Sequence, residues 1–232
     1  MLELLFAAAL ITVAAQDEGP PCVAYDSEDL NIGMALVPGR PGGEIPIQAT
    51  TGLHGMIGVP LRCFSQWGSS DAAVSVAPER RRVVIGRDAK PGDDVEITGT
   101  LGSRTVRTRF RIAPAEGPVL TGYWSQASVD CGGPVPREPL RELRVESDGR
   151  FAVTFVLFEV REDYWGSIEF NPVAGRIGFV VERANSTLPA GLMLKGEARV
   201  EGDDRLALNG VYFGGLEAGP PVEGCRYVFQ KR

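Results

Sequence analysis

The segment from Phe151 to Glu182 alternates between apolar and other residues with a period of two. Phe151, Val153 and Phe155 fall on one face of an extended chain, and the residues between them fall on the other face. A helix would repeat its apolar residues at a period of about 3.6, so this pattern predicts strands. Two turn-forming breaks divide the segment, and we therefore expect three consecutive antiparallel strands.

Similar alternating runs flank this segment, and together they predict eight strands after residue 118. Sequential antiparallel strands suit an up-and-down barrel, which leaves no exposed sheet edge. A barrel of eight strands is filled by its own side chains or holds one small ligand, and the many Phe, Leu and Ile residues at inward positions favour filling. The expected strands are Val119–Ser125, Leu140–Glu146, Phe151–Leu157, Tyr164–Phe170, Arg176–Glu182, Leu192–Val200, Arg205–Phe213 and Arg226–Gln230.

The N-terminal half shows short apolar runs separated by Gly- and Pro-rich turns and no helical stripe, which predicts about seven strands and a β-sandwich. A leader at 1–15, a sandwich at 16–113, a Pro- and Gly-containing linker at 114–118 and a barrel at 119–232 are the expected parts. The fold class that we expect is therefore all-β, with the strands of the sandwich at Leu30–Val37, Ile45–Ala49, Ile57–Leu61, Ala73–Val76, Arg82–Ile85, Val95–Leu101 and Val106–Ile112.

The second half of this predicted sandwich resembles a known family. The motif Trp67-Gly68-Ser69-Ser70-Asp71, with the strands and the Ala89-Lys90-Pro91-Gly92 turn that follow it, is similar to the bacterial Ig-like repeats of the group 2 type. Arg81-Arg82 departs from the family pattern, and Cys22 and Cys63 are additions to it. The resemblance implies an Ig-like sandwich that serves as a spacer or adhesive unit and carries no catalytic site.

The first strand of the predicted barrel carries a second resemblance. Gly122-Tyr123-Trp124 is similar to the Gly-x-Trp that begins the first strand of lipocalin-like barrels and of the small bacterial META/HslJ-type domains. In lipocalins a basic residue late in the barrel packs over this Trp. The resemblance implies that Arg226, beside Cys225, closes the barrel over Trp124 by a cation–π contact.

Export is indicated by the first residues and by the cysteines. Residues 1–15 are apolar and end in Val-Ala-Ala before a polar stretch, as a secretory signal peptide does, although Glu3 replaces the usual basic residue. The four cysteines contain no CxxC pair, which favours two disulfides over a metal site. Three pairings are open, and we favour Cys22–Cys63 with Cys131–Cys225 because each pair then lies within one predicted unit. A periplasmic or secreted location is expected.

The composition and the motifs exclude several classes of function. Both halves carry an acidic surplus within a net charge of -6, which argues against nucleic acid as a partner. The chain has one histidine, His54, and no phosphate-binding loop or nucleophile motif, so no catalytic residue, metal or cofactor is expected. Carboxylate chemistry stays open as an alternative, because acidic residues gather around one predicted hairpin: Glu159, Glu162, Asp163 and Glu169.

One predicted strand presents arginines on a single face. Arg107, Arg109 and Arg111 alternate with Val106, Thr108, Phe110 and Ile112. A solvent-exposed outer face accounts for this alternation, and the other reading is a site for an anionic partner to which Arg80, Arg81, Arg82 and Arg104 contribute.

Three hypotheses for function follow. The first is a non-catalytic bacterial envelope protein that acts by binding or surface interaction, with an unknown envelope protein as partner and no membrane span. The second is a lipocalin-like carrier of a small apolar ligand, and the third is an exported hydrolase that uses carboxylates. The residues that would line the carrier's site are Trp124, Phe151, Phe155, Ile168, Phe179 and Leu208.

Overall fold

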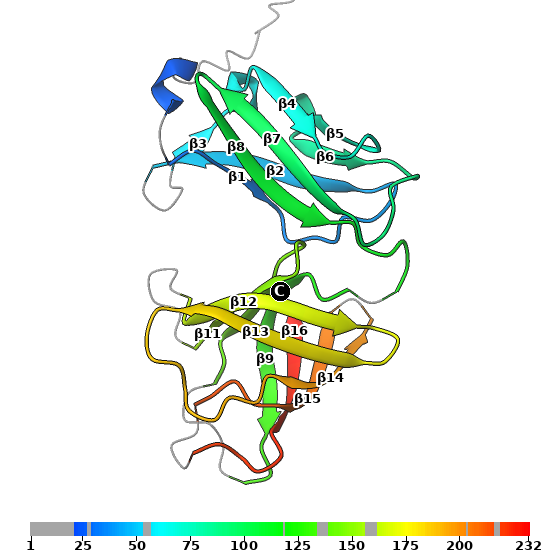
Figure 1. Ribbon diagram of the computed structural model, residues 1–232, viewed down its shortest axis with the longest axis vertical. Coiled ribbons are helices and arrows are strands. Elements are labelled where there is room, and N and C mark those ends of the chain that lie inside the picture. Colours follow the sequence, from blue (N-terminus) through cyan, green and yellow to red (C-terminus); the bar gives the residue numbers. More distant parts are fainter. Residues whose placement is uncertain are drawn as a thin grey trace, which may run out of the picture.

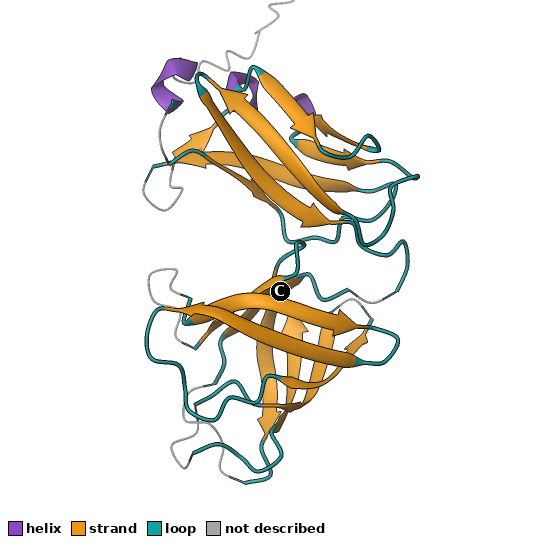
Figure 2. Ribbon diagram, in the orientation of Figure 1, coloured by secondary structure: helices purple, strands orange, loops and turns teal. Residues whose placement is uncertain are grey.

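The computed structural model of this chain describes residues 21–26, 29–52, 57–117, 119–133, 139–155, 162–202, 204–215 and 219–232. Strands account for 54% of the chain and helices for 5%, which confirms the all-β class (Figure 2). No helix in these described ranges is long and apolar enough to cross a lipid bilayer. The expected leader at 1–15 and His54 lie outside the described residues.

The N-terminal half is a sandwich of two antiparallel sheets. One sheet has the strand order β1-β2-β6-β5, with β3 paired to β2, and the other has the order β4-β7-β8 (Figure 1). The elements are the 3-10 turns η1 (Cys22–Tyr25), η3 (Leu61–Cys63) and η4 (Pro78–Arg80), and the strands β1 (Asn31–Met34), β2 (Glu44–Thr51), β3 (Ile57–Val59), β4 (Gln66–Ser69), β5 (Val74–Ala77), β6 (Arg82–Ile85), β7 (Asp94–Leu101) and β8 (Arg104–Arg111).

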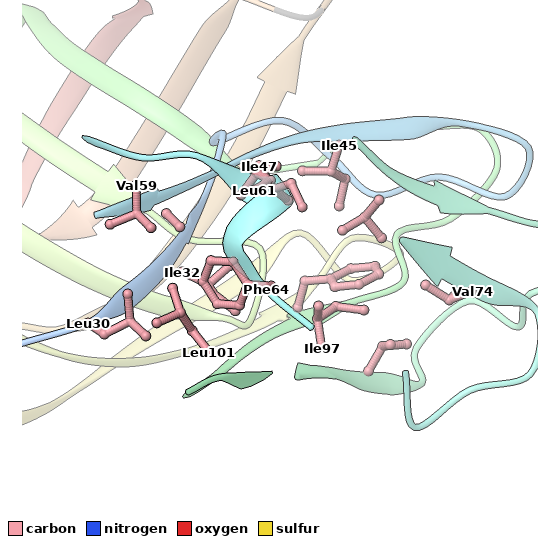
Figure 3. Close-up of a cluster of buried hydrophobic side chains, with 14 of the residues drawn as sticks. Leu30, Ile32, Ile45, Ile47, Val59, Leu61, Phe64, Val74, Ile97 and Leu101 are labelled. Atoms are coloured by element: carbon pink, nitrogen blue, oxygen red, sulfur yellow. The ribbon is translucent and has the colours of Figure 1, made fainter. Parts of the chain in front are cut away.

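The sandwich closes over apolar side chains from both sheets. Ile45 of β2 and Ile97 of β7 are completely buried, and Figure 3 shows them pointing into the space between the sheets. Strands β2 and β7 bury alternate residues, because successive side chains of a strand point to opposite faces. The alternation seen in the sequence therefore sets which side chains build this core.

The C-terminal half is a closed barrel of eight antiparallel strands in sequential order. The last strand, β16, pairs with the first, β9, and so no sheet edge is left open (Figure 1). All eight strands expected from the sequence are present, with ends that differ by a few residues. The strands are β9 (Gly122–Asp130), β10 (Glu142–Val145), β11 (Arg150–Thr154), β12 (Tyr164–Asn171), β13 (Arg176–Ala184), β14 (Lys195–Glu201), β15 (Arg205–Val211) and β16 (Cys225–Lys231).

One strand of the sandwich was not expected. Gln66–Ser69 forms β4 and pairs with β7, although its Trp-Gly-Ser sequence is typical of a turn. Trp67 packs against Phe64 with ring centroids 4.6 Å apart, and this contact supplies the apolar anchor that the short strand otherwise lacks. Tertiary packing thus outweighs the local turn preference here.

Two disulfides link the cysteines in the favoured pairing, Cys22 with Cys63 and Cys131 with Cys225. The first closes a loop with a sequence separation of 41 within the sandwich, and the second a loop with a separation of 94 within the barrel. Closing loops of these lengths stabilises a fold mainly by restricting the unfolded chain.

Replacing Cys131 and Cys225 by Ser is expected to lower the free energy of unfolding of the barrel by about 2–5 kcal/mol. Urea denaturation followed by NMR signals of Phe229 in the barrel and Phe110 in the sandwich measures each unit. The matched variant with Cys22→Ser and Cys63→Ser should destabilise the sandwich instead. Equal losses in both units from one bridge would contradict this assignment.

Candidate functional site

The residues predicted to line a site for an apolar ligand lie in the interior of the barrel. Trp124, Phe151, Phe179 and Leu208 are at most 4% exposed and belong to one hydrophobic cluster. Phe155 and Ile168 are partly buried and pack against the same cluster. The structure thus brings all six residues together, and they form a packed core.

Aromatic rings fill the middle of this core in edge-to-face contact. Phe179 lies between Phe151 and Phe213, with centroid distances of 5.0 and 5.1 Å, and Phe213 contacts Tyr227 at 5.3 Å. Such T-shaped pairs stabilise a core beyond the apolar area that they bury. The rings are packed against one another and fill the part of the interior where a hollow barrel would hold its ligand.

Two buried tyrosine hydroxyls are satisfied by the main chain of Phe213. Tyr164 Oη donates a hydrogen bond to the carbonyl of Phe213 at 2.8 Å, and the N–H of Phe213 donates to Tyr227 Oη at 3.4 Å. Burial raises the pKa of Tyr164, and burial also raises the pKa of Tyr227 to about 12. Both hydroxyls therefore stay neutral at physiological pH and serve structural roles.

The expected contact between Arg226 and Trp124 is wrong. Arg226 is exposed and pairs with Asp130 at the far end of β9, six residues and about 20 Å along the strand from Trp124. Lys231 takes this position, with its ammonium nitrogen 5.3 Å from the centre of the Trp124 ring. The indole Nε1 of Trp124 donates to the carbonyl of Leu120 at 2.6 Å.

Gly122 makes room for this closure of the barrel. Its φ is +150°, and a Cβ atom at this position would lie 2.4 Å from Cε of Lys231. A Cβ at this position would therefore displace the Lys231 side chain from the tryptophan and would strain a backbone conformation that favours glycine.

Replacing Gly122 by Ala is expected to lower the free energy of unfolding by about 1–3 kcal/mol, because of backbone strain and displacement of Lys231. The fluorescence maximum of Trp124 should shift to longer wavelength as water reaches the ring. Gly133→Ala is the control, since its Cβ would meet no atom within 4 Å. Equal stability of the two variants would refute the steric role of Gly122.

Two of the four carboxylates proposed for hydrolysis, Glu162 and Asp163, are engaged in structural contacts. Glu162 forms an ion pair with Arg144, and Asp163 Oδ2 accepts a hydrogen bond from the N–H of Phe155 at 2.7 Å. Glu169 lies on the exposed face of β12, and Glu159 lies outside the described residues. Among the described residues, no three His, Cys, Asp or Glu side chains are grouped so as to hold a metal ion.

The arginines of β8 lie on the outer face of the sandwich, beside acidic residues of β7. Arg107 and Arg109 both contact Glu96, at 3.6 and 2.8 Å, and Arg111 makes a two-point contact with Asp94. The hydrogen bonds to Asp94, and the negative charges of Asp94 and Asp148, raise the pKa of Arg111. Among the other basic residues considered for an anionic site, Arg80 and Arg82 contact Glu44, Arg104 contacts Asp26, and Arg81 adopts a left-handed backbone conformation.

Hydrogen bonds tie the linker and the barrel to the sandwich. The guanidinium of Arg40 donates to the carbonyls of Pro114 and Gly117, at 2.5 and 2.8 Å. The N–H of Arg111 donates to the carbonyl of Ser147, in the turn between β10 and β11, at 2.9 Å. The two halves of the chain thus meet where β8 ends (Figure 1).

A groove of about 630 Å³ runs along this meeting point, and we call it the junction groove. Its sandwich side is formed by β1 and β8, and its barrel side by residues around the β10–β11 turn. The lining residues are Asn31, Ile32, Gly33, Met34, Leu36, Glu96, Arg107, Thr108, Arg109, Tyr123, Arg144, Glu146, Ser147, Asp148 and Arg150.

The junction groove brings two of the predicted arginines together with residues that the sequence did not single out. Arg144 and Arg150 of the barrel both contact Glu146, at 3.0 and 2.6 Å. Only the approach of the two halves places them opposite Arg107 and Arg109. No pattern within one segment of the sequence signals such a site.

Comparisons of this chain with models of known protein families, with curated protein sequences and with solved structures found no match.

Proposed function

We propose that this chain is a non-catalytic, exported bacterial envelope protein that recognises a partner on its outer surface. The observation that carries the proposal is the packed barrel interior, where Phe179 contacts both Phe151 and Phe213. With side chains filling the interior, the outer faces and the junction groove are the surfaces left for recognition.

The strand order supports the resemblance of the sandwich to Ig-like domains. Sheets ordered β1-β2-β6-β5 and β4-β7-β8 correspond to the ABED and CFG sheets of a constant-type immunoglobulin sandwich, with β3 as an addition. Ig-like modules act as spacers and adhesive units, and this role agrees with a surface function.

The strand order of the barrel and the side chain that closes it support the resemblance to lipocalin-like barrels. Eight sequential strands begin with Gly122-Tyr123-Trp124, and a basic side chain from the last strand covers the tryptophan. That residue is Lys231 and not Arg226. We infer a lipocalin-like architecture whose interior has become a solid core.

Export is supported by the apolar stretch at 1–15 and by the two disulfides, because disulfides persist in oxidising compartments. We propose the periplasm or the cell exterior as the location. The partner that we propose is another envelope protein.

Native mass spectrometry of the protein purified from the envelope of its own host tests this function. The expected result is the mass of the processed chain without a bound small molecule, and no turnover of polysaccharide or peptide substrates. A stoichiometric apolar molecule released on denaturation would establish the carrier instead. Turnover abolished by Glu162→Gln or Glu169→Gln, but not by the control Glu182→Gln, would establish the hydrolase.

A further inference from the structure

Strand β8 is the last strand of its sheet, and half of its main-chain groups point away from β7. The N–H of Ile112 donates to the carbonyl of Asp93 at 2.9 Å, so even-numbered residues of this segment face β7. The odd-numbered residues face the other way, and the hydrogen bond from Arg111 N–H to Ser147 confirms that direction. The outward main-chain groups of Arg107 and Arg109 therefore open into the junction groove.

The side chains beside this edge define two faces. Arg107 and Arg109 project from the outer face of the sheet, with 64% and 68% of their side chains exposed. On the inner side, the half-buried Met34 and Leu36 of the segment containing β1 line the same groove, whereas the side chain of Ile32 is buried in the sandwich core. A strand placed along β8 would thus have a basic neighbour on one face and apolar neighbours on the other.

Strand β7, which pairs with the opposite edge of β8, already places acidic residues on the outer face and apolar residues on the inner face. Its acidic residues Asp94 and Glu96 contact the arginines, and the alternate residues Val95 and Ile97 are completely buried. Side chains directly opposite each other on neighbouring strands interact, so β8 selects acidic residues at alternate positions of a paired strand. The free edge presents the same arginines.

We propose that the open edge of β8 in the junction groove binds an extended polypeptide segment in which acidic and apolar residues alternate. The segment adds as a further strand, with its main chain bonded to Arg107 and Arg109, its acidic side chains beside the guanidinium groups and its apolar side chains toward β1. This inference rests on the proposed function and names the chemistry of its partner.

The charge of the groove favours an acidic strand over a neutral or basic one. Arg107 and Arg109 share one carboxylate, Glu96, which leaves a surplus of one positive charge beside the open edge. Arg144 and Arg150, on the barrel side of the groove, are balanced by Glu146, Asp148 and Glu162. Charged side chains at a sheet edge also discourage pairing with strands of the same charge. The edge is thus selective for acidic partners.

The probe is a fluorescently labelled peptide with the sequence of β7, Asp-Val-Glu-Ile-Thr-Gly-Thr-Leu, and its neutral counterpart carries Asn and Gln in place of Asp and Glu. Fluorescence anisotropy measures the binding of both peptides to the full chain. The acidic peptide is expected to bind about threefold to tenfold more tightly, and added salt should reduce this difference.

Two variants separate the contribution of charge from that of the main chain. Arg107→Gln keeps the outward N–H and should reduce the preference for the acidic peptide. Arg107→Pro also removes that N–H while leaving the hydrogen bonds to β7. It should weaken the binding of both peptides about threefold or more relative to Arg107→Gln. Circular dichroism in the near ultraviolet verifies that both variants are folded.

Three results would overturn the proposal. These are equal binding of the two peptides, equal binding of the acidic peptide to Arg107→Gln and Arg107→Pro, and binding of the acidic peptide to the unchanged protein weaker than about 1 mM. None of these results contradicts the proposed function, because recognition elsewhere on the surface would remain and the native mass spectrum tests that function separately.

Discussion

The pairing of main-chain groups between strands is the constraint on which this structure depends, because an all-β chain must either bond or protect every strand edge. The barrel meets this constraint by closing β16 on β9. The same closure brings Lys231 over Trp124 and so seals the end of the core. The sandwich meets it in part: Ala113 beside β8 bonds to Gly39, and Arg111 bonds to the turn of the barrel. On the N-terminal side of these contacts, at Arg107 and Arg109, the edge of β8 remains open.

Apolar and charged side chains occupy different places in this protein. Aromatic and aliphatic side chains occupy the interior of the barrel, and its buried polar groups, such as the hydroxyls of Tyr164 and Tyr227, are bonded to the main chain of Phe213. Charged groups lie outside, and four arginines line the groove where the sandwich and the barrel meet. Recognition at the surface is the function that this distribution favours.

Much of the fold was predictable from local patterns. Alternation and turn residues located all eight barrel strands, and the cysteine positions favoured the pairing that the structure contains. Strand β4 was missed because the packing of Trp67 on Phe64 is a tertiary contact. Lys231 was missed because the register between the first and last strands is set by tertiary pairing, and this pairing places Lys231, not Arg226, opposite Trp124. The junction groove depends on contacts between segments far apart in the sequence, such as Arg111 with Ser147.

The central claim is that the barrel interior is solid, and xenon binding tests it most directly. An empty apolar cavity takes up xenon, and NMR chemical shifts of the methyl groups around it then change with xenon pressure. The methyl signals of Leu206 and Leu208, both completely buried in the barrel, should show no saturable shift. Saturable shifts at these methyl groups would reveal a cavity and would contradict the claim that recognition is confined to the outer surface.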